Sequence, residues 1–402
     1  MAIYLIDALN IIDSLDIAPH IETLCLESAI DRICAVEIKA TIDLPGSDNS
    51  AMDGYAIKLQ DAGKSVHIVE TILAGSLPKN ELQPGKAIKV MTGAKLPVGT
   101  EAVVPIEDVE YEGENVKLPS KIKPKANMRF KGEDIAQGEK IVTRGQKLDA
   151  FQIALLASQG ISYIDVYKKP LVAIFATGSE LKMHFESLQA SQIYNSNTPS
   201  FYARCLELGC DVRLIRSSGD NLDSIKRAIE NALDADLIIT SGGMSVGEAD
   251  FTKEAFKEMG MEIFFSKIDV KPGKPTTLGK IGSTFVLNLP GNPLAAQLNF
   301  ELFGRTLINR LKGLKAYHLC PIRAKLKEKF INKPGRDTII PGFFDGEYFY
   351  PTTKRASGMV STMAKANGFI IASKEVSELK KEVLFIPLWE FYANEPKRLI
   401  ST

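Results

Sequence analysis

The segment L-I-I-T-S-G-G-M-S-V-G-E-A-D, residues 237–250, decides how the central part of this chain folds. Its apolar, β-branched start predicts a buried strand, and the glycines and serines that follow predict a tight loop leading into a helix. The same order of strand, loop and helix recurs at residues 171–180 and 284–293. Such alternation is typical of a parallel sheet covered on both faces. We therefore expect a three-layer α/β domain over residues 169–313.

Individual elements of this domain follow from the same patterns. We expect strands at 171–176, 212–215, 237–240 and 284–289, and helices at 199–208, 222–233, 252–259 and 293–311.

The flanking sequence has a different character. Residues 1–45 look mostly helical, with Leu5, Leu9 and Ile12 at helical spacing and a second short helix near 28–33, and 148–158 predicts a helix that packs back on them. Short β-rich runs with Gly and Pro turns fill the stretch between, and they return after Gly313. The expected fold class is multidomain α/β plus β. Its domains are a helical N-terminal part (1–45 and 141–168), an inserted β-rich domain (46–140), the α/β domain (169–313) and a C-terminal β domain (314–402).

Composition narrows the function classes. Lys+Arg and Asp+Glu balance at 49 each, so no global field favours nucleic acid or an anionic membrane. Five cysteines without a C-x-x-C pair and four scattered histidines indicate neither a disulfide framework, a zinc knuckle nor an imidazole-rich metal centre. An apolar run of about 18 residues and a signal peptide are both lacking. We expect a cytoplasmic protein.

Glycine-rich loops follow three of the expected strands. In open α/β sheets, ligands bind beyond the carboxyl ends of the strands, where glycines allow a phosphate to approach the backbone. The alternative is a tight turn with Asp250 capping a helix; the neighbouring loops favour the binding interpretation. The candidate binding residues in these loops are Gly242, Gly243, Ser245, Gly247, Pro290 and Pro293.

Charged residues near these loops suggest two further features. Glu180, Asp220 and Asp250 each follow a strand end and could supply oxygen ligands to Mg²⁺, although each could instead cap a helix. Lys271 and Lys274 lie in I-D-V-K-P-G-K-P, where the prolines restrain the loop, and Lys267 directly precedes this motif. That restraint suits a preorganised oxyanion site better than a solvated charge run.

Two patches in the first half of the chain combine acids with polar groups. They are D-N-S-A-M-D-G-Y-A at 48–56 and R-F-K-G-E-D at 129–134. As bare composition, either patch could be an Asx turn or a salt-bridged hairpin.

These motifs together resemble the molybdopterin molybdenumtransferase family, represented by bacterial MoeA and the gephyrin E domain. D-N-S-A-M-D-G-Y-A, M-T-G-A, R-F-K-G-E-D-I, A-T-G-S-E-L, S-G-G-M-S-V-G-E-A-D, K-P-G-K-P and L-P-G-N-P occur in the family's order. The resemblance implies a homodimer of elongated subunits with a molybdopterin-binding α/β domain and a C-terminal β-barrel. It also implies an active site between the α/β domain of one subunit and the first two domains of its mate.

The same resemblance implies the activity. It is Mg²⁺-dependent insertion of molybdate into adenylyl-molybdopterin with release of AMP. Contacts with the molybdopterin adenylyltransferase and with recipient molybdoenzymes would then be expected, and contacts with nucleic acid or membrane would not. Two alternatives stay open, an adenylyltransferase and a gephyrin-like scaffold without enzymatic activity, and the sequence does not separate molybdate from tungstate.

Residue roles carry over motif by motif. The resemblance gives catalytic roles to Asp53, Thr92, Asp134, Lys267 and Lys271, substrate contacts to Arg129, Lys274 and Ser357, and metal contacts to Glu180, Asp220 and Asp250. Arg336 matches a family position more weakly, as does Ser357. The chain departs from the family at Ser179, where an Asp is usual, and at Ser218-Gly219-Asp220, where a more acidic segment is usual. Both departures bear on the metal ligands.

Overall fold

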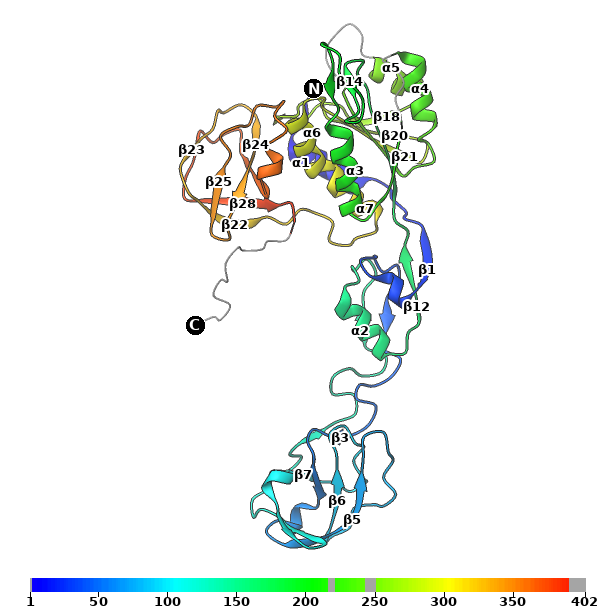
Figure 1. Cartoon of the computed structure of the whole chain (residues 1–402), viewed down its shortest axis with the longest axis vertical. Helices are drawn as coiled ribbons and strands as arrows, with labels where there is room; N and C mark the ends of the chain where they lie inside the picture. The colour runs from blue at the N-terminus through cyan, green and yellow to red at the C-terminus, as the bar shows by residue number, and fades with distance from the viewer. Residues whose placement is uncertain (1, 216–220, 243–250, 390–402) are drawn as a thin grey trace.

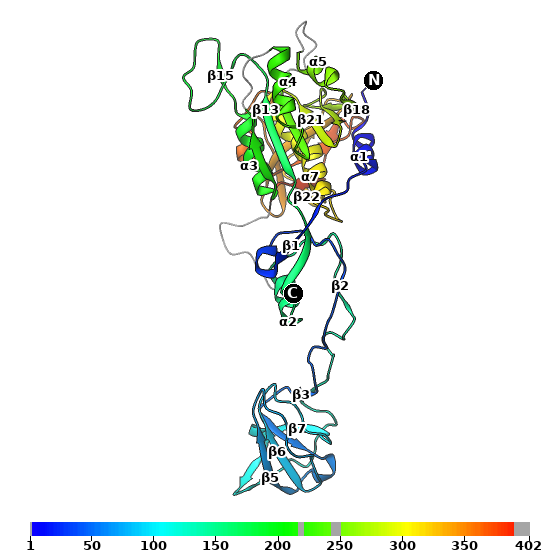
Figure 2. The same ribbon diagram turned by 90° about the vertical axis from the view of Figure 1, so that its right-hand side faces the viewer.

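The computed structural model describes residues 2–215, 221–242 and 251–389 of an elongated molecule (Figure 1). The α/β domain and the C-terminal β domain lie side by side at one end together with helix α1 (Leu5–Ser14), the rest of the N-terminal part lies in the middle, and the inserted β-rich domain forms the other end. A view turned by 90° shows the same order (Figure 2). The inserted domain is therefore well separated from the α/β domain of its own chain.

The α/β domain is built on a six-stranded sheet. Its strands run in the order β16 (Asp211–Leu214), β13 (Leu171–Ala176), β17 (Leu237–Ser241), β21 (Thr284–Leu289), β20 (Thr277–Ile281) and β18 (Glu262–Phe265). The first four are parallel, and every residue of β17 and β21 is buried. Complete burial requires cover on both faces.

Helices supply that cover on each face. Packed on one face are α4 (Leu222–Glu230) and α5 (Phe251–Glu258), in a core that includes Phe175 of β13. On the other lie α3 (Asn197–Glu207), α6 (Pro293–Asn299) and α7 (Arg305–Leu311), in a core that includes Ile174. Adjacent residues of one strand thus enter opposite cores, as the pleat dictates. The expected three-layer arrangement is confirmed.

Two details of this domain differ from the expectation. Strands β18 and β20 are antiparallel to their neighbours, so the sheet is not parallel throughout. A turn at Gly282, with φ of 56°, joins β20 directly to β21 as a hairpin, which needs no crossover helix. The helix expected at 293–311 is interrupted by a π-helical segment, η4 (Phe300–Gly304).

The N-terminal part is less helical than expected. Helix α1 (Leu5–Ser14) packs through Ala8 and Ile12 into the core of the α/β domain. Strand β1 (Ile21–Cys25) pairs with β12 (Tyr163–Tyr167) in an antiparallel ribbon, and the expected second helix is only a 3-10 turn, η1 (Leu26–Ala29). Helix α2 (Ala150–Ser158) contacts η1 and begins with a capping box at Asp149. The helical expectation is thus wrong for residues 21–25, where strand pairing prevails.

Two segments connect the inserted domain to the rest of the chain, and in them β2 (Ile38–Lys39) pairs with β11 (Lys140–Val142). Its six-stranded sheet has the order β7 (Ala102–Pro105), β4 (Gly54–Ile57), β6 (Lys86–Val90), β5 (Ser65–Ile72), β9 (Asn115–Lys117) and β8 (Glu110–Glu112). Strand β3 (Asn49–Ser50) pairs with β10 (Met128–Arg129) where these connecting segments enter the inserted domain.

The C-terminal domain is a closed five-stranded barrel. Strands β24 (Asp337–Phe344), β25 (Tyr348–Pro351), β22 (Ile322–Leu326), β28 (Glu382–Pro387) and β26 (Gly368–Ala372) follow one another, and β26 pairs back with β24. The expected fold class is confirmed, while the four domain boundaries remain predictions. The remaining short elements are η2 (Leu59–Asp61), η3 (Ile106–Asp108), β14 (Leu181–Lys182), β15 (Ile193–Tyr194), β19 (Val270–Lys271), β23 (Phe330–Ile331), η5 (Met363–Lys365) and β27 (Glu378–Leu379).

Candidate functional site

Three loops meet at the carboxyl edge of the central sheet. Gly242 follows β17 with φ of 97°, and a Cβ on it would lie 2.6 Å from the carbonyl oxygen of Thr177, which follows β13. Gly291, after β21, approaches so closely that its Cβ would lie 3.4 Å from the Cα of Gly242. At position 242, the short contact and the positive φ together require glycine. The structure thus brings Gly242 together with the loop that holds Pro290 and Pro293.

Asn197 ties these loops together, although the sequence analysis did not select it. This first residue of α3 is 6% exposed, and its Nδ2 donates to the carbonyl of Gly291 at 2.9 Å and lies 3.3 Å from Oγ of Ser241. Its buried Oδ1 has no hydrogen-bond partner in the described part of the chain. An unpaired buried acceptor is costly, which makes this oxygen a candidate acceptor for a ligand N–H group. The run Asn195–Asn197 before a helix was the signal that could have revealed it.

The predicted metal site can be traced only in part. Asp220 and Asp250 lie outside the described residues, as do Gly243, Ser245 and Gly247. Glu180 is exposed, and its carboxylate lies against the backbone of Gly178. Among residues 2–215, 221–242 and 251–389, no group of three or more His, Cys, Asp or Glu could hold a metal ion.

The predicted lysines lie where the α/β domain joins the barrel. Lys271 belongs to β19, which pairs in parallel with β24 through Val270 and Asp337. The loop is held by hydrogen bonds from Ile268 N to the carbonyl of Lys274 at 2.9 Å, and from Ile3 N to the carbonyl of Lys267 at 3.0 Å. The sequence placed this segment in a loop of the α/β domain, whereas the structure makes it part of the barrel's sheet.

All three lysines are exposed cations. Within the described residues, Lys267, Lys271 and Lys274 form no ion pair with an acid. Arg336 adds a further cation, because its guanidinium lies 3.5 Å from the carbonyl of Val270, next to Lys271. Four positive groups therefore come from two short stretches of chain. An oxyanion is the natural partner for such a set.

Ser357 reaches the glycine edge from the barrel. Its carbonyl oxygen accepts the backbone N–H of Leu294 at 2.9 Å, in the first turn of α6. A Cβ on the next residue, Gly358, would lie 3.8 Å from Oδ1 of Asn292. The N–H of Ala295 donates to the same carbonyl at 3.4 Å, so the barrel loop caps α6 and occupies two N–H groups that an anion could otherwise use.

The predicted residues of the inserted domain form a separate group. Asp53 accepts hydrogen bonds from Thr92 N at 2.7 Å and Thr92 Oγ1 at 2.8 Å, and both residues are exposed. These bonds, the backbone bond first, hold the pKa of Asp53 below its ordinary value. Arg129 lies on β10, paired across to Asn49 of β3, and among the described residues it has no acidic partner. Asp134 N donates to the carbonyl of Leu44 at the domain entrance.

Local turns are also present in these patches, as their bare composition indicated. Lys131 pairs with Asp43 at 3.1 Å, and Glu133 accepts the N–H of Phe130 at 2.7 Å. These contacts shape the loop but leave Asp53, Thr92 and Arg129 outside them. The three residues belong to the inserted domain, which lies at the opposite end of the molecule from the barrel to which Lys271 is paired (Figures 1 and 2).

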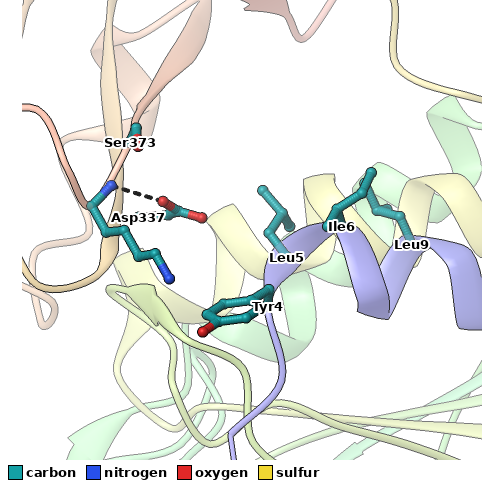
Figure 3. A pocket seen from close by; sticks show the side chains of 7 residues that line it. Tyr4, Leu5, Ile6, Leu9, Asp337 and Ser373 are labelled. Atoms are coloured by element: carbon teal, nitrogen blue, oxygen red, sulfur yellow. Dashed lines mark hydrogen bonds between the residues drawn. The ribbon is translucent and has the colours of Figure 1, made fainter.

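A mostly apolar pocket of about 400 Å³ lies between α1 and the barrel (Figure 3). The ammonium of Lys374 lies 3.7 Å from the ring centre of Tyr4, and Lys374 N donates to Asp337 at 2.9 Å. Leu5, Ile6, Leu9 and Ser373 complete the lining. None of the predicted site residues lines this pocket, so it stands apart from the glycine edge.

Comparison with known proteins covers the three parts of the chain. Residues 3–160 match the MoeA N-terminal region (domain I and II), 173–310 match a probable molybdopterin binding domain, and 323–388 match the MoeA C-terminal region (domain IV). The fold and the glycine edge therefore define a MoeA-type protein with a molybdopterin-binding α/β domain.

Whole-length relatives give the family. The chain is 34% identical to the molybdopterin molybdenumtransferase of Haemophilus influenzae over 91% of this chain and 93% of that one, and 32% identical to that of a Nostoc species over 90% and 87%. A molybdopterin biosynthesis MoeA structure from Pyrococcus horikoshii superposes with a TM-score of 0.84 at 31% identity, covering 97% of this chain and 100% of that one. This chain belongs to the molybdopterin molybdenumtransferase family, whose members are transferases of molybdenum cofactor biosynthesis.

Proposed function

We propose that the protein inserts molybdate into adenylyl-molybdopterin and releases AMP. The observation that carries this proposal is the pair of exposed lysines Lys271 and Lys274, preceded by Lys267, in a proline-containing turn that leads into β20. The three lysines have no acidic partner among the described residues, and Thr277 of β20 pairs with Asn288 at the end of β21, just before the loop of Gly291. An oxyanion at the lysines would lie next to loops suited to a pterin phosphate. The two reactants would then be held together without further movement of the chain.

In this proposal, different residues of the chain bind different parts of the two substrates. Lys267, Lys271 and Lys274 hold the molybdate or the adenylate phosphate, and Gly242 and the loop from Pro290 to Pro293 receive the pterin phosphate. Asp53, held ionised by Thr92, accepts hydrogen bonds from substrate and helps to place the metal, while Arg129 offers a charge to a phosphate. Asp134 and Ser357 complete the proposed set.

Mg²⁺ is the proposed cofactor. It would neutralise charge on the phosphoanhydride as the AMP group leaves. Because Mg²⁺ usually takes one or two carboxylates together with substrate oxygens, exposed Glu180 suits it, and Asp220 and Asp250 stay as predicted ligands. Ser179, where the family usually has an acid, leaves Glu180 as the carboxylate of that motif within the described residues.

We propose a homodimer, because the two groups of residues belong to different parts of the elongated chain. Asp53 and Thr92 belong to the inserted domain at one end of the molecule, whereas Lys271 pairs with the barrel at the other end, so a second subunit would supply Asp53 and Thr92 to the site. Mixing Asp53→Asn with Lys271→Ala tests this, because a mixed dimer keeps one intact site while neither parent has one. Partial recovery of turnover is expected. A mixture as inactive as its parents would contradict the shared site, provided that subunits exchange.

Turnover itself is tested by stoichiometry. AMP released and metal incorporated are measured from adenylyl-molybdopterin with molybdate or tungstate, and with Mg²⁺ chelated as a control. We expect equal amounts, loss of both on chelation, and a drop on the order of 10²-fold for Lys271→Ala. Lys280→Ala is the matched control, because that lysine lies over Phe285 of the sheet instead.

The same assay decides among the alternatives. Consumption of ATP and free molybdopterin would identify an adenylyltransferase, and no turnover with either substrate would favour a scaffold. A cytoplasmic location remains a prediction; in the described residues no helix has the length and apolar character needed to cross a membrane.

A further inference from the structure

Asn299 is a polar residue fully buried at the end of α6, with 0% of its surface exposed. Its Nδ2 donates to the carbonyl of Ala295 at 2.7 Å, one turn back in the helix, and to the carbonyl of Pro272 at 3.1 Å. Both acceptors are carbonyls, so the orientation of the amide group is determined. One side chain of the helix core thus holds the K-P-G-K-P turn.

Gly273 makes the contact between turn and helix unusually close. A Cβ on Gly273 would lie 1.7 Å from Nδ2 of Asn299, and the glycine has φ of 115°. The turn therefore rests directly on the asparagine amide. A bond from Thr276 Oγ1 to the carbonyl of Gly273 at 2.8 Å closes the turn on its other side.

This contact links the lysines to the glycine edge. Lys271 and Lys274 flank Pro272 and Gly273, and α6, which carries Asn299, begins at the loop next to Gly291. Resting on the function proposed above, we infer that Asn299 is a positioning residue, which holds Lys271 and Lys274 at the separation an oxyanion requires. It acts through the turn and does not touch the substrate.

Two variants test this inference with different risks to folding. Asn299→Ala removes both donated bonds and leaves space in the core, while Asn299→Asp keeps the volume and sets an oxygen against two carbonyls. Asn309→Ala is the matched control, because Asn309 also donates from this helical stretch to a loop carbonyl, that of Tyr317 at 3.4 Å. Steady-state kinetics of AMP release separate the KM for molybdate from the KM for adenylyl-molybdopterin.

We expect the KM for molybdate to rise about five- to tenfold in both Asn299 variants, the effect of losing one buried hydrogen bond. The KM for adenylyl-molybdopterin and the kinetics of Asn309→Ala should stay near wild type. Hydrogen exchange over residues 267–277, measured by mass spectrometry on the whole protein, should be faster in the Asn299 variants alone. A merely structural role would change stability without this KM split.

Unchanged exchange in the turn would overturn the inference, as would an unchanged KM for molybdate in an active enzyme. A wild-type protein without molybdate-dependent turnover would instead refute the proposed function. Hydrogen exchange would then still decide whether Asn299 holds the turn, so the two failures are distinguishable.

Discussion

Replacing Gly242 by alanine should damage both the stability of the α/β domain and its turnover. The added methyl would lie 2.6 Å from the Thr177 carbonyl oxygen, and the residue has φ of 97°. Left-handed backbone costs alanine about 1–2 kcal/mol. The carbonyl cannot move freely, because Thr177 N donates to the carbonyl of Ser241 at 3.3 Å, so overpacking should add about 1–3 kcal/mol.

The expected loss in free energy of unfolding is the sum of these costs, about 2–5 kcal/mol. Urea unfolding followed by circular dichroism measures it for the whole protein. Turnover should fall by about 10²-fold at a temperature where the variant is still folded, because forcing the loops apart by a few tenths of an ångström or more misplaces the bound phosphate.

Gly282→Ala is the matched control for this experiment. Gly282 also has positive φ, 56°, but nothing lies within 4 Å of its added Cβ. The free energy of unfolding of Gly282→Ala should fall only by the conformational cost of about 1–2 kcal/mol, and the variant should keep its turnover. If Gly242→Ala were tolerated as well as Gly282→Ala in both assays, the close packing of the three loops would not matter as argued.

Two further predictions concern charged groups. Thr92→Val removes one of the two hydrogen bonds that lower the pKa of Asp53, so the pKa of Asp53 should rise. As the solution is acidified, activity that needs the carboxylate should then be lost at a higher pH than in the wild type. An unchanged acid limb of the pH–rate profile, together with an unchanged titration of the carboxyl group by NMR, would contradict this prediction. Glu301→Gln should cost about 3–5 kcal/mol in urea unfolding, because buried Glu301 accepts a hydrogen bond from Arg204 at 2.7 Å. Burial is the largest single influence on the pKa of Arg204 and lowers it, but Glu301 and Glu207 together raise that pKa above its ordinary value. Glu207→Gln, which removes a more exposed partner of the same arginine, should cost about 0–1 kcal/mol, and equal losses for the two would refute the distinction.

Local patterns predicted the elements of the α/β domain well. The strands at Leu171–Ala176 and Thr284–Leu289 have the expected bounds, because short, mostly apolar runs of six residues that end at glycine loops favour a buried strand. Strands β18 and β20 were missed, since short runs beside the K-P-G-K-P turn carry no comparable periodicity. Residues 21–25 were taken as helical because their partner strand lies more than a hundred residues away.

The candidate site was predictable only as a set of motifs. Glycines, lysines and carboxylates can be recognised as candidate site residues from the sequence, because their chemistry belongs to the single residue. Asn197 is signalled only weakly, by the run Asn195–Asn197, since an asparagine at the start of a helix is usually only a cap. Asn299 gives no signal at all, because its importance comes from a carbonyl 27 positions earlier in the chain.

The sequence by itself therefore determined the family, the buried strands and the chemical types available at their ends. The tertiary structure decided which of them meet. It placed Lys271 in a ladder with the barrel, set Ser357 over the start of α6, and left Asp53 in the inserted domain, away from both. The reason is physical: hydrophobic periodicity is written in neighbouring residues, whereas pairing between distant segments depends on how whole domains pack.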